Sequence, residues 1–433
     1  MTADGPPVPS KRPPQPSEAG KKEQDPAAKG GGPGDASPLE VFGVFLKLGL
    51  TSFGGPIAHL GYFRDELVVR RRWIGEAGYA DLVALCQFLP GPASSQVSFC
   101  LGVLRGGGLL GGLAAWLAFT LPSAIILTAF ALGASALAGP LAAGMLHGLK
   151  LVAVAVVAQA IWGMARTLTP DRERVAIALA AVLLTALTAG WFNQIGAIAI
   201  GALAGLWLCR TGKSVPVGRL GFAVSRRKGI LALVLFAACF LLPALLAGMV
   251  GRDTAFSGAM TLFDAFYRSG ALVFGGGHVV LPLLQAEVVA PGWVGNEAFL
   301  AGYGLAQAVP GPLFTFAAYL GAVMTPTPNG IAGALIALVA VFAPGLLLVY
   351  GMLPFWDTLR SRPAAQAAMR GANAAVVGIL AAALYTPVWT SAVLSPRDFA
   401  LALTGFLLLT VWKIPPWIVV ALLSAGGALI ALA

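Results

Sequence analysis

Two basic side chains lie in long apolar stretches of this sequence. Lys47 belongs to the segment 41–60, Arg268 belongs to the segment 262–286, and neither segment holds a second Lys or Arg. A cation is expensive to bury in an apolar environment, so such a residue indicates a functional site. Most apolar segments hold no acidic residue, so we expect both cations to lack protein partners and to bind an anion. The alternatives are that each side chain reaches a polar interface, or that Asp264 neutralises Arg268 from four residues upstream.

A Phe-Gly-Gly motif follows each of these cations after a few residues. Glycine allows a helix to unwind and the backbone to approach a ligand, and the N–H groups at a helix start favour anions. Two such motifs behind two cations therefore predict an anion site at broken helices, although glycine also serves close packing between helices. The residues that we assign to this part of the site are Ser52, Phe53, Gly54, Gly55, Phe274, Gly275 and Gly276.

A Pro-Gly-Pro motif occurs in the middle of each following apolar segment. Each proline lacks an N–H donor and blocks helix continuation, so each segment is predicted to form two half-helices joined by a turn. Uncharged polar residues flank both turns, and their side chains can hydrogen-bond either an oxyanion or the freed backbone groups. The site residues predicted here are Gln87, Pro90, Gly91, Pro92, Gln96, Gln307, Pro310, Gly311 and Pro312.

All of these motifs occur twice because the sequence is duplicated. Residues 45–55 align with residues 266–276, and the offset between matching positions stays between 219 and 226 along both halves. Internal duplication with glycine- or proline-interrupted segments is typical of secondary transporters. Lys150 falls opposite Asn373 in this alignment, and we place the two residues either beside a permeation pathway or near a helix end.

The composition excludes a soluble protein of this size. Of 433 residues, 58% are hydrophobic and only 11% are charged, whereas ordinary soluble domains carry about 25% charge. The chain is therefore predicted to be an all-α polytopic membrane protein that is embedded in a lipid bilayer. Its net charge of +10 comes from short loops between apolar segments, which membrane topology explains, so no nucleic acid partner is expected.

The sequence shows no constellation for catalysis, metal binding or cofactor binding. The four cysteines lie in or beside apolar stretches without metal-ligand spacing. His59 and His278 are not equivalent in the duplication, and we interpret both as packing or interfacial residues. We therefore predict no catalytic residue, no metal and no cofactor, in a chain that is not an enzyme.

The chain divides into four parts. Residues 1–38 are predicted to be a disordered cytoplasmic tail and residues 39–210 the first transporter repeat. Residues 211–251 hold a basic linker and one extra transmembrane helix, and residues 252–433 form the second repeat. One extra helix between two halves with even numbers of crossings gives the repeats inverted topologies.

The positions of the basic residues favour one topology. If the first two apolar segments of each half are re-entrant hairpins, nearly all Lys and Arg residues outside the membrane lie on the cytoplasmic face. The amino terminus is then inside and the carboxyl terminus is outside. This arrangement has nine full crossings and four re-entrant hairpins, whereas the alternative has thirteen crossings and an arginine-rich external loop at residues 64–72.

The paired Phe-Gly-Gly and Pro-Gly-Pro motifs and the duplicated layout resemble the chromate ion transporter family in its long, two-domain form. The resemblance covers residues 39–433. It implies export of chromate across the bacterial inner membrane, driven by ion gradients, and resistance to chromate. It also implies that sulfate, a tetrahedral dianion of similar shape, competes with chromate or exchanges for it.

Three classes of function are compatible with these residues. The leading hypothesis is secondary active transport of an oxyanion by alternating access, with Lys47 and Arg268 holding the dianion. The alternatives are a passive anion channel on the same half-helices, or a transporter of another oxyanion such as sulfate. An enzyme acting on lipid phosphates ranks last because no nucleophile or metal set is present. The coupling ion and the oligomeric state stay open, a homodimer included.

Overall fold

The computed structural model describes residues 36–133, 139–187, 192–210, 224–249, 254–360 and 362–432. Within these ranges the chain is helical and contains no strand, which confirms the predicted all-α class. The predicted tail lies almost entirely outside the described residues, and so does most of the basic linker.

The first half consists of long helices that follow two broken ones. Its elements are α1 (Pro38–Thr51), α2 (Gly55–Phe63) with the π-helix η2 (Arg64–Arg70), α3 (Glu76–Phe88), α4 (Ala93–Arg105), α5 (Leu109–Gly133), α6 (Pro140–Leu168), α7 (Arg172–Leu187) and α8 (Phe192–Leu208). A single helix, α9 (Arg226–Met249), then connects the halves.

The second half repeats this order. Its elements are α10 (Ala255–Ala271), η4 (Gly277–Val279), α11 (Val280–Leu284), η5 (Gln285–Val289), α12 (Asn296–Ala306), η6 (Leu313–Thr315), α13 (Phe316–Val323), α14 (Gly330–Met352), η7 (Leu353–Phe355), α15 (Trp356–Arg360), α16 (Pro363–Ala383), η8 (Leu384–Trp389), α17 (Thr390–Ala392), α18 (Pro396–Thr410) and α19 (Pro416–Leu432). Both copies begin with a side-chain cap, from Ser37 before α1 and from Thr254 before α10.

The four predicted helix breaks are present. The chain leaves helical geometry between α1 and α2, between α3 and α4, between α10 and η4, and between α12 and η6. Each break coincides with a Phe-Gly-Gly or Pro-Gly-Pro motif, because glycine permits the left-handed backbone and proline removes the donor that a continuing helix needs.

Five helical stretches in the described part of the chain are long and apolar enough to cross a membrane, as expected of a multi-pass protein. They are Leu109–Gly133, Pro140–Leu168, Arg226–Ala247, Gly330–Phe355 and Pro363–Ala392. The other four helices that we predicted to be full crossings, α7, α8, α18 and α19, have 15 to 17 residues. They are shorter than the ~20 residues that span hydrocarbon without local thinning.

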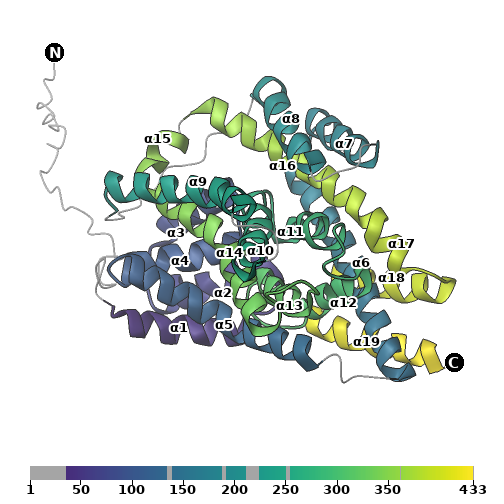
Figure 1. The fold of residues 1–433 in the computed structure, drawn as a ribbon. Coiled ribbons are helices and arrows are strands. Elements are labelled where there is room, and N and C mark those ends of the chain that lie inside the picture. Colours follow the sequence, from purple (N-terminus) through teal and green to yellow (C-terminus); the bar gives the residue numbers. More distant parts are fainter. Residues whose placement is uncertain are drawn as a thin grey trace, which may run out of the picture.

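The last helices of each half pack against the opposite half. Helix α6 of the first half lies along α19, while α16 of the second half lies along α7 and α8 (Figure 1). Glycines allow these close approaches: a Cβ atom on Gly148 would collide with the α19 backbone at Leu423, and one on Gly205 would collide with the α16 backbone at Ala367. The two halves are therefore interlocked.

We predict that Gly205→Val lowers the midpoint of thermal unfolding in detergent, because its side chain has no space against α16. Overpacking of this kind costs about 3 kcal/mol at the upper end of its range. Gly196→Val is the matched control, since Gly196 lies on the same helix and has nothing within 4 Å of a Cβ position. Equal midpoints for the two variants would contradict the interlocked packing.

Candidate anion site

The four helix breaks, at residues 52–54, 89–92, 272–276 and 307–312, meet at one place inside the protein. We call this place the crossing, and there the two halves exchange backbone hydrogen bonds. The N–H of Gly91, in the first Pro-Gly-Pro turn, donates to the carbonyl of Val273, just before the second Phe-Gly-Gly motif, at 2.7 Å. The N–H of Gly311 donates to the carbonyl of Ser52 at 2.9 Å in the equivalent way. A reciprocal exchange of this kind is the signature of a two-fold relation between two units. The four breaks thus form one central feature.

Glycine is required at the crossing for two reasons. The backbone φ angle is +122° at Gly91 and +102° at Gly311, a region that other residues rarely adopt. A Cβ atom on Gly91 would also lie 2.9 Å from the Cα of Gly345, and one on Gly311 would lie 2.8 Å from the hydroxyl oxygen of Ser123. The Pro-Gly-Pro turns therefore approach the long helices α14 and α5 more closely than any side chain allows.

Two helices begin at the crossing without a side-chain cap. Helix α4 follows Pro92 and helix α2 follows Gly54, and neither residue offers an acceptor for the first N–H groups. These groups have no partner within their own helix, and they lie at the positive end of the helix dipole. Helix starts of this type favour a negative ligand, and the start of α4 is buried.

Of the predicted neutral site residues, Gln96 and Asn373 lie at the crossing. Gln96 is fully buried, and its amide nitrogen donates to the carbonyls of Pro90 (2.8 Å) and Gly345 (3.0 Å). The side-chain oxygen of Asn373 lies 3.6 Å from the Cβ position of Gly275, beside the second break. Asn373 therefore faces the crossing from α16.

Three other predicted residues differ in their surroundings. Gln87 is exposed on α3, so its side chain lies outside the buried crossing. Gln307 is half-buried at the second Pro-Gly-Pro turn, and its amide nitrogen has no partner among the described residues. Lys150 points from α6 to Glu297 on α12, with 3.1 Å between the charged atoms, and so joins the two halves rather than lining a break.

Lys47 lies four residues before the end of α1 and Arg268 three residues before the end of α10, but neither lacks a partner. Lys47 pairs with Glu66 of η2 at 3.5 Å, and Arg268 pairs with Asp264 of its own helix at 2.9 Å. The expectation of unpartnered cations is therefore wrong. The alternative in which Asp264 neutralises Arg268 is correct, because a spacing of four residues places both side chains on one helical face.

A signal for the first of these pairs was present in the duplication. Glu66 and Glu287 occupy matching positions, each nineteen residues after the cation of its half. Glu287 also interacts electrostatically with Arg268. Each half thus carries a carboxylate that the chain brings back to its own cation after the helix break.

His59 lies at the crossing, although sequence reasoning assigned it no role there. Its ring is buried, its Nδ1 lies 3.4 Å from the hydroxyl of Ser94 on α4, and its ring centroid lies 5.3 Å from that of Phe119 on α5. His278 instead shares a hydrogen bond with the Tyr303 hydroxyl at 2.7 Å. The proximity of His59 to the first Phe-Gly-Gly motif was the available signal.

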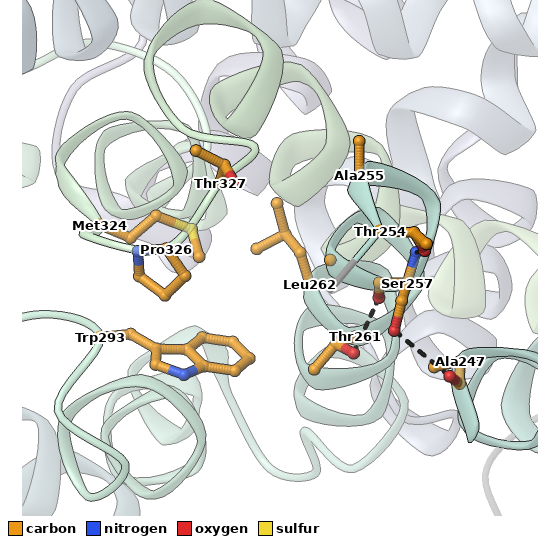
Figure 2. A pocket seen from close by; sticks show the side chains of 11 residues that line it. Ala247, Thr254, Ala255, Ser257, Thr261, Leu262, Trp293, Met324, Pro326 and Thr327 are labelled. Atoms are coloured by element: carbon orange, nitrogen blue, oxygen red, sulfur yellow. Dashed lines mark hydrogen bonds between the residues drawn. The ribbon is translucent and has the colours of Figure 1, made fainter. Parts of the chain in front are cut away.

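A cavity of about 700 Å³ lies elsewhere, at the far end of α10 (Figure 2). Its wall from α10 ends at Leu262, ten residues or about 15 Å of helix before the break. The hydroxyls of Ser257 and Thr261 bond to the carbonyls of Ala247 and Ser257. Two of its hydroxyls are thus taken up by backbone carbonyls and no lining residue is charged, so the cavity offers no cation to an oxyanion.

Comparison with known proteins identifies the family of this chain. The model of the family described as "Chromate transporter" matches residues 39–206 and again residues 260–430. The chain belongs to the chromate transporter family. Both matches include one Phe-Gly-Gly and one Pro-Gly-Pro motif, so the crossing is built from family sequence on both sides. No solved structure matches the chain.

Three relatives are named as chromate transport proteins or probable chromate transport proteins. The chain is 29% identical to the chromate transport protein of Pseudomonas aeruginosa, over 90% of this chain and 91% of that protein. It is 30% identical to the probable chromate transport protein of Synechococcus elongatus, over 78% and 82% of the two chains. It is 27% identical to the chromate transport protein of Cupriavidus metallidurans, over 90% and 91%. All three of these relatives are named as transport proteins.

Gly91→Ala is expected to abolish chromate transport, because the new methyl group would collide with α14 and strain the turn. The measurement is chromate uptake into everted membrane vesicles, with the amount of folded protein determined by size-exclusion chromatography. Gly43→Ala, on α1, should transport normally since nothing lies within 4 Å of its Cβ position. Normal uptake by Gly91→Ala would show that the crossing is dispensable.

Proposed function

We propose that this chain is a secondary active transporter that exports chromate across the bacterial inner membrane, with the crossing of helix breaks as its substrate site. The observation that carries the proposal is the reciprocal exchange between Gly91 and Val273 and between Gly311 and Ser52. It brings the uncapped start of α4 to a buried position between the halves, with the uncapped start of α2 beside the first break. Such a position is suited to an anion that must pass from one side to the other.

The packing supports alternating access. The broken helices α1 and α4 lie against the long helix α5, and their counterparts α10 and α13 lie against α14. At the crossing itself, the described backbone hydrogen bonds between the halves are the two reciprocal ones. The broken helices of one half can therefore rock against α5 or α14 while only a few backbone hydrogen bonds break and form again. The interlocked helices α6, α8, α16 and α19 hold the two halves together during this motion.

Lys47 is the cation that we assign to the moving substrate. Its 3.5 Å contact with Glu66 is longer than those that Arg70 (3.0 Å) and Arg71 (2.8 Å) make with the same carboxylate. Glu66 therefore stays paired when Lys47 leaves it, so Lys47 can turn to a dianion at little cost. Arg268, bonded to Asp264 within α10, contributes a fixed positive charge at the second break.

The charge distribution supports export. The η2 region of the first half holds Arg64, Arg70, Arg71 and Arg72, and the positive-inside rule puts this region on the cytoplasmic face. A basic face attracts anions and raises their local concentration. The equivalent region after the second break, residues 277–295, holds Glu287 and no Lys or Arg. Chromate is thus drawn to the crossing from the cytoplasm, and sulfate, with the same shape and charge, competes for it.

The decisive test is accumulation against a gradient. Reconstituted wild-type protein should concentrate chromate inside proteoliposomes when an ion gradient is imposed, whereas a passive channel would only equalise chromate on the two sides. Lys47→Ala should slow this accumulation at least tenfold, since an interaction between a cation and a dianion is lost. Lys47→Arg, which keeps the charge, is the matched comparison. Equilibration without accumulation by the wild type would establish the channel.

Electrostatic attraction predicts a salt-dependent difference between two exposed arginines. Arg64→Gln should lower the initial rate of chromate uptake about twofold at 10 mM salt, where charges act over about 30 Å, and should leave it unchanged at 1 M salt. Arg397→Gln, at the start of α18 on the opposite face in the proposed topology, should have no effect at either salt concentration. Equal effects of the two substitutions would count against attraction from the cytoplasmic face.

A further inference from the structure

We propose that the first half alone recognises the oxyanion, through the start of α4 and a ring of neutral hydrogen-bond donors from Ser52, His59, Ser95 and Thr120. This inference rests on the proposed function and specifies its binding site. It replaces a symmetric site shared by two halves with an asymmetric one, in which the second half supplies an apolar wall.

The donors are buried and unpaired in the described structure. Ser52 and Ser95 have 0% of their surface exposed, and His59 and Thr120 have 1%. The three hydroxyl oxygens and the Nε2 atom of His59 have no hydrogen-bond partner among the described residues. Buried polar groups in folded proteins nearly always find partners, because leaving one unpaired is costly. Four such groups in the first half therefore indicate a ligand that accepts hydrogen bonds.

Contacts connect these residues to one another. His59 of α2 reaches Ser94 of α4, and its ring lies edge-on against Phe119, the neighbour of Thr120 on α5. In the tautomer in which the Ser94 hydroxyl donates to Nδ1, the Nε2 atom of His59 carries the proton and is a donor. The carbonyl of Ser52 accepts from the Gly311 turn, which in turn touches α5. These contacts link the first break, α2 and α5 to the first turn of α4.

The start of α4 supplies the positive end of a helix of 13 residues. Its N-cap is Pro92, which makes no side-chain cap, so the first N–H groups of the helix stay available to a ligand. Ser95 lies in this first turn. Backbone donors, hydroxyls and an imidazole N–H together suit a tetrahedral oxyanion, which presents acceptor oxygens in all directions.

The second half does not repeat this chemistry. In the duplication Val273 stands opposite Ser52, Val280 opposite His59, and Phe342 opposite Thr120, and all three are fully buried. A hydroxyl survives at Thr315, opposite Ser95, but it donates to the carbonyl of Pro312 at 2.7 Å within its own turn.

Gln96 limits what the site accepts. Its amide nitrogen is held by the carbonyls of Pro90 and Gly345, so its Oε1 atom is fixed as an acceptor and has no described partner. This oxygen repels a bare oxyanion oxygen and accepts from a hydroxyl. The ligand therefore binds away from the Oε1 atom of Gln96.

The test compares the two halves at equivalent positions. Ser95→Ala and Thr120→Val, in the full-length protein, should each weaken equilibrium binding of radiolabelled sulfate about tenfold and raise the KM for chromate similarly, since each removes one hydrogen bond to a charged ligand. Thr315→Val is the matched control and should change either value less than about twofold. His59→Gln, which keeps a side-chain N–H, should bind better than His59→Leu.

Distinct outcomes separate this inference from the proposed function. Wild-type protein that neither binds nor accumulates an oxyanion overturns the proposed function itself. Wild-type protein that accumulates chromate overturns only the asymmetric site if Ser95→Ala and Thr120→Val bind sulfate normally. Equal losses in Ser95→Ala and Thr315→Val also overturn it, in favour of a symmetric site. If one variant fails to fold, the His59 pair decides by the same sulfate measurement.

Discussion

The structure depends on two hydrogen bonds between backbones, from Gly91 to Val273 and from Gly311 to Ser52. A helix that breaks inside an apolar environment exposes N–H and carbonyl groups that water cannot reach, and each must find another partner. Here each break finds part of its partner set in the opposite half. Neither half can therefore satisfy its broken helices alone, which accounts for the exchange of α8 and α19 between the halves as a second way of holding them together.

Buried charges are subject to the same requirement for a partner. An isolated cation in hydrocarbon is costly, and a carboxylate partner for each of the two cations lowers that cost. The arrangements differ: Glu66 is shared among Lys47, Arg70 and Arg71, whereas Asp264 binds Arg268 within one helix. A carboxylate shared by three cations stays paired when one of them leaves, whereas Arg268 is the cation in the described salt bridge of Asp264. Neutralisation at rest is thus compatible with a mobile charge in one half and a fixed charge in the other.

The fold class and the helix breaks could be predicted because their causes are local. Proline removes a donor and glycine adopts left-handed geometry wherever they occur, so Pro90 and Gly91 predict a break without knowledge of any neighbour. The partner of Lys47 and the position of His59 depend on how helices pack, and the spacing of residues along one segment does not contain that information. The duplication held part of it, since Glu66 and Glu287 follow their cations at one spacing.

Duplication creates two similar halves, but a transporter benefits when they stop being identical. In a symmetric crossing, every group that binds the anion in one half has an equivalent group in the other half. That equivalent group either competes for the anion or lies buried and unpaired when the anion is absent. Replacement of Ser52, His59 and Thr120 by Val273, Val280 and Phe342 in the second copy removes those equivalent groups. The second half then keeps the backbone geometry that the crossing requires without the cost of unpaired donors. An apolar wall also slides past a bound ion more easily than a second set of hydrogen bonds, each of which would have to break at every cycle.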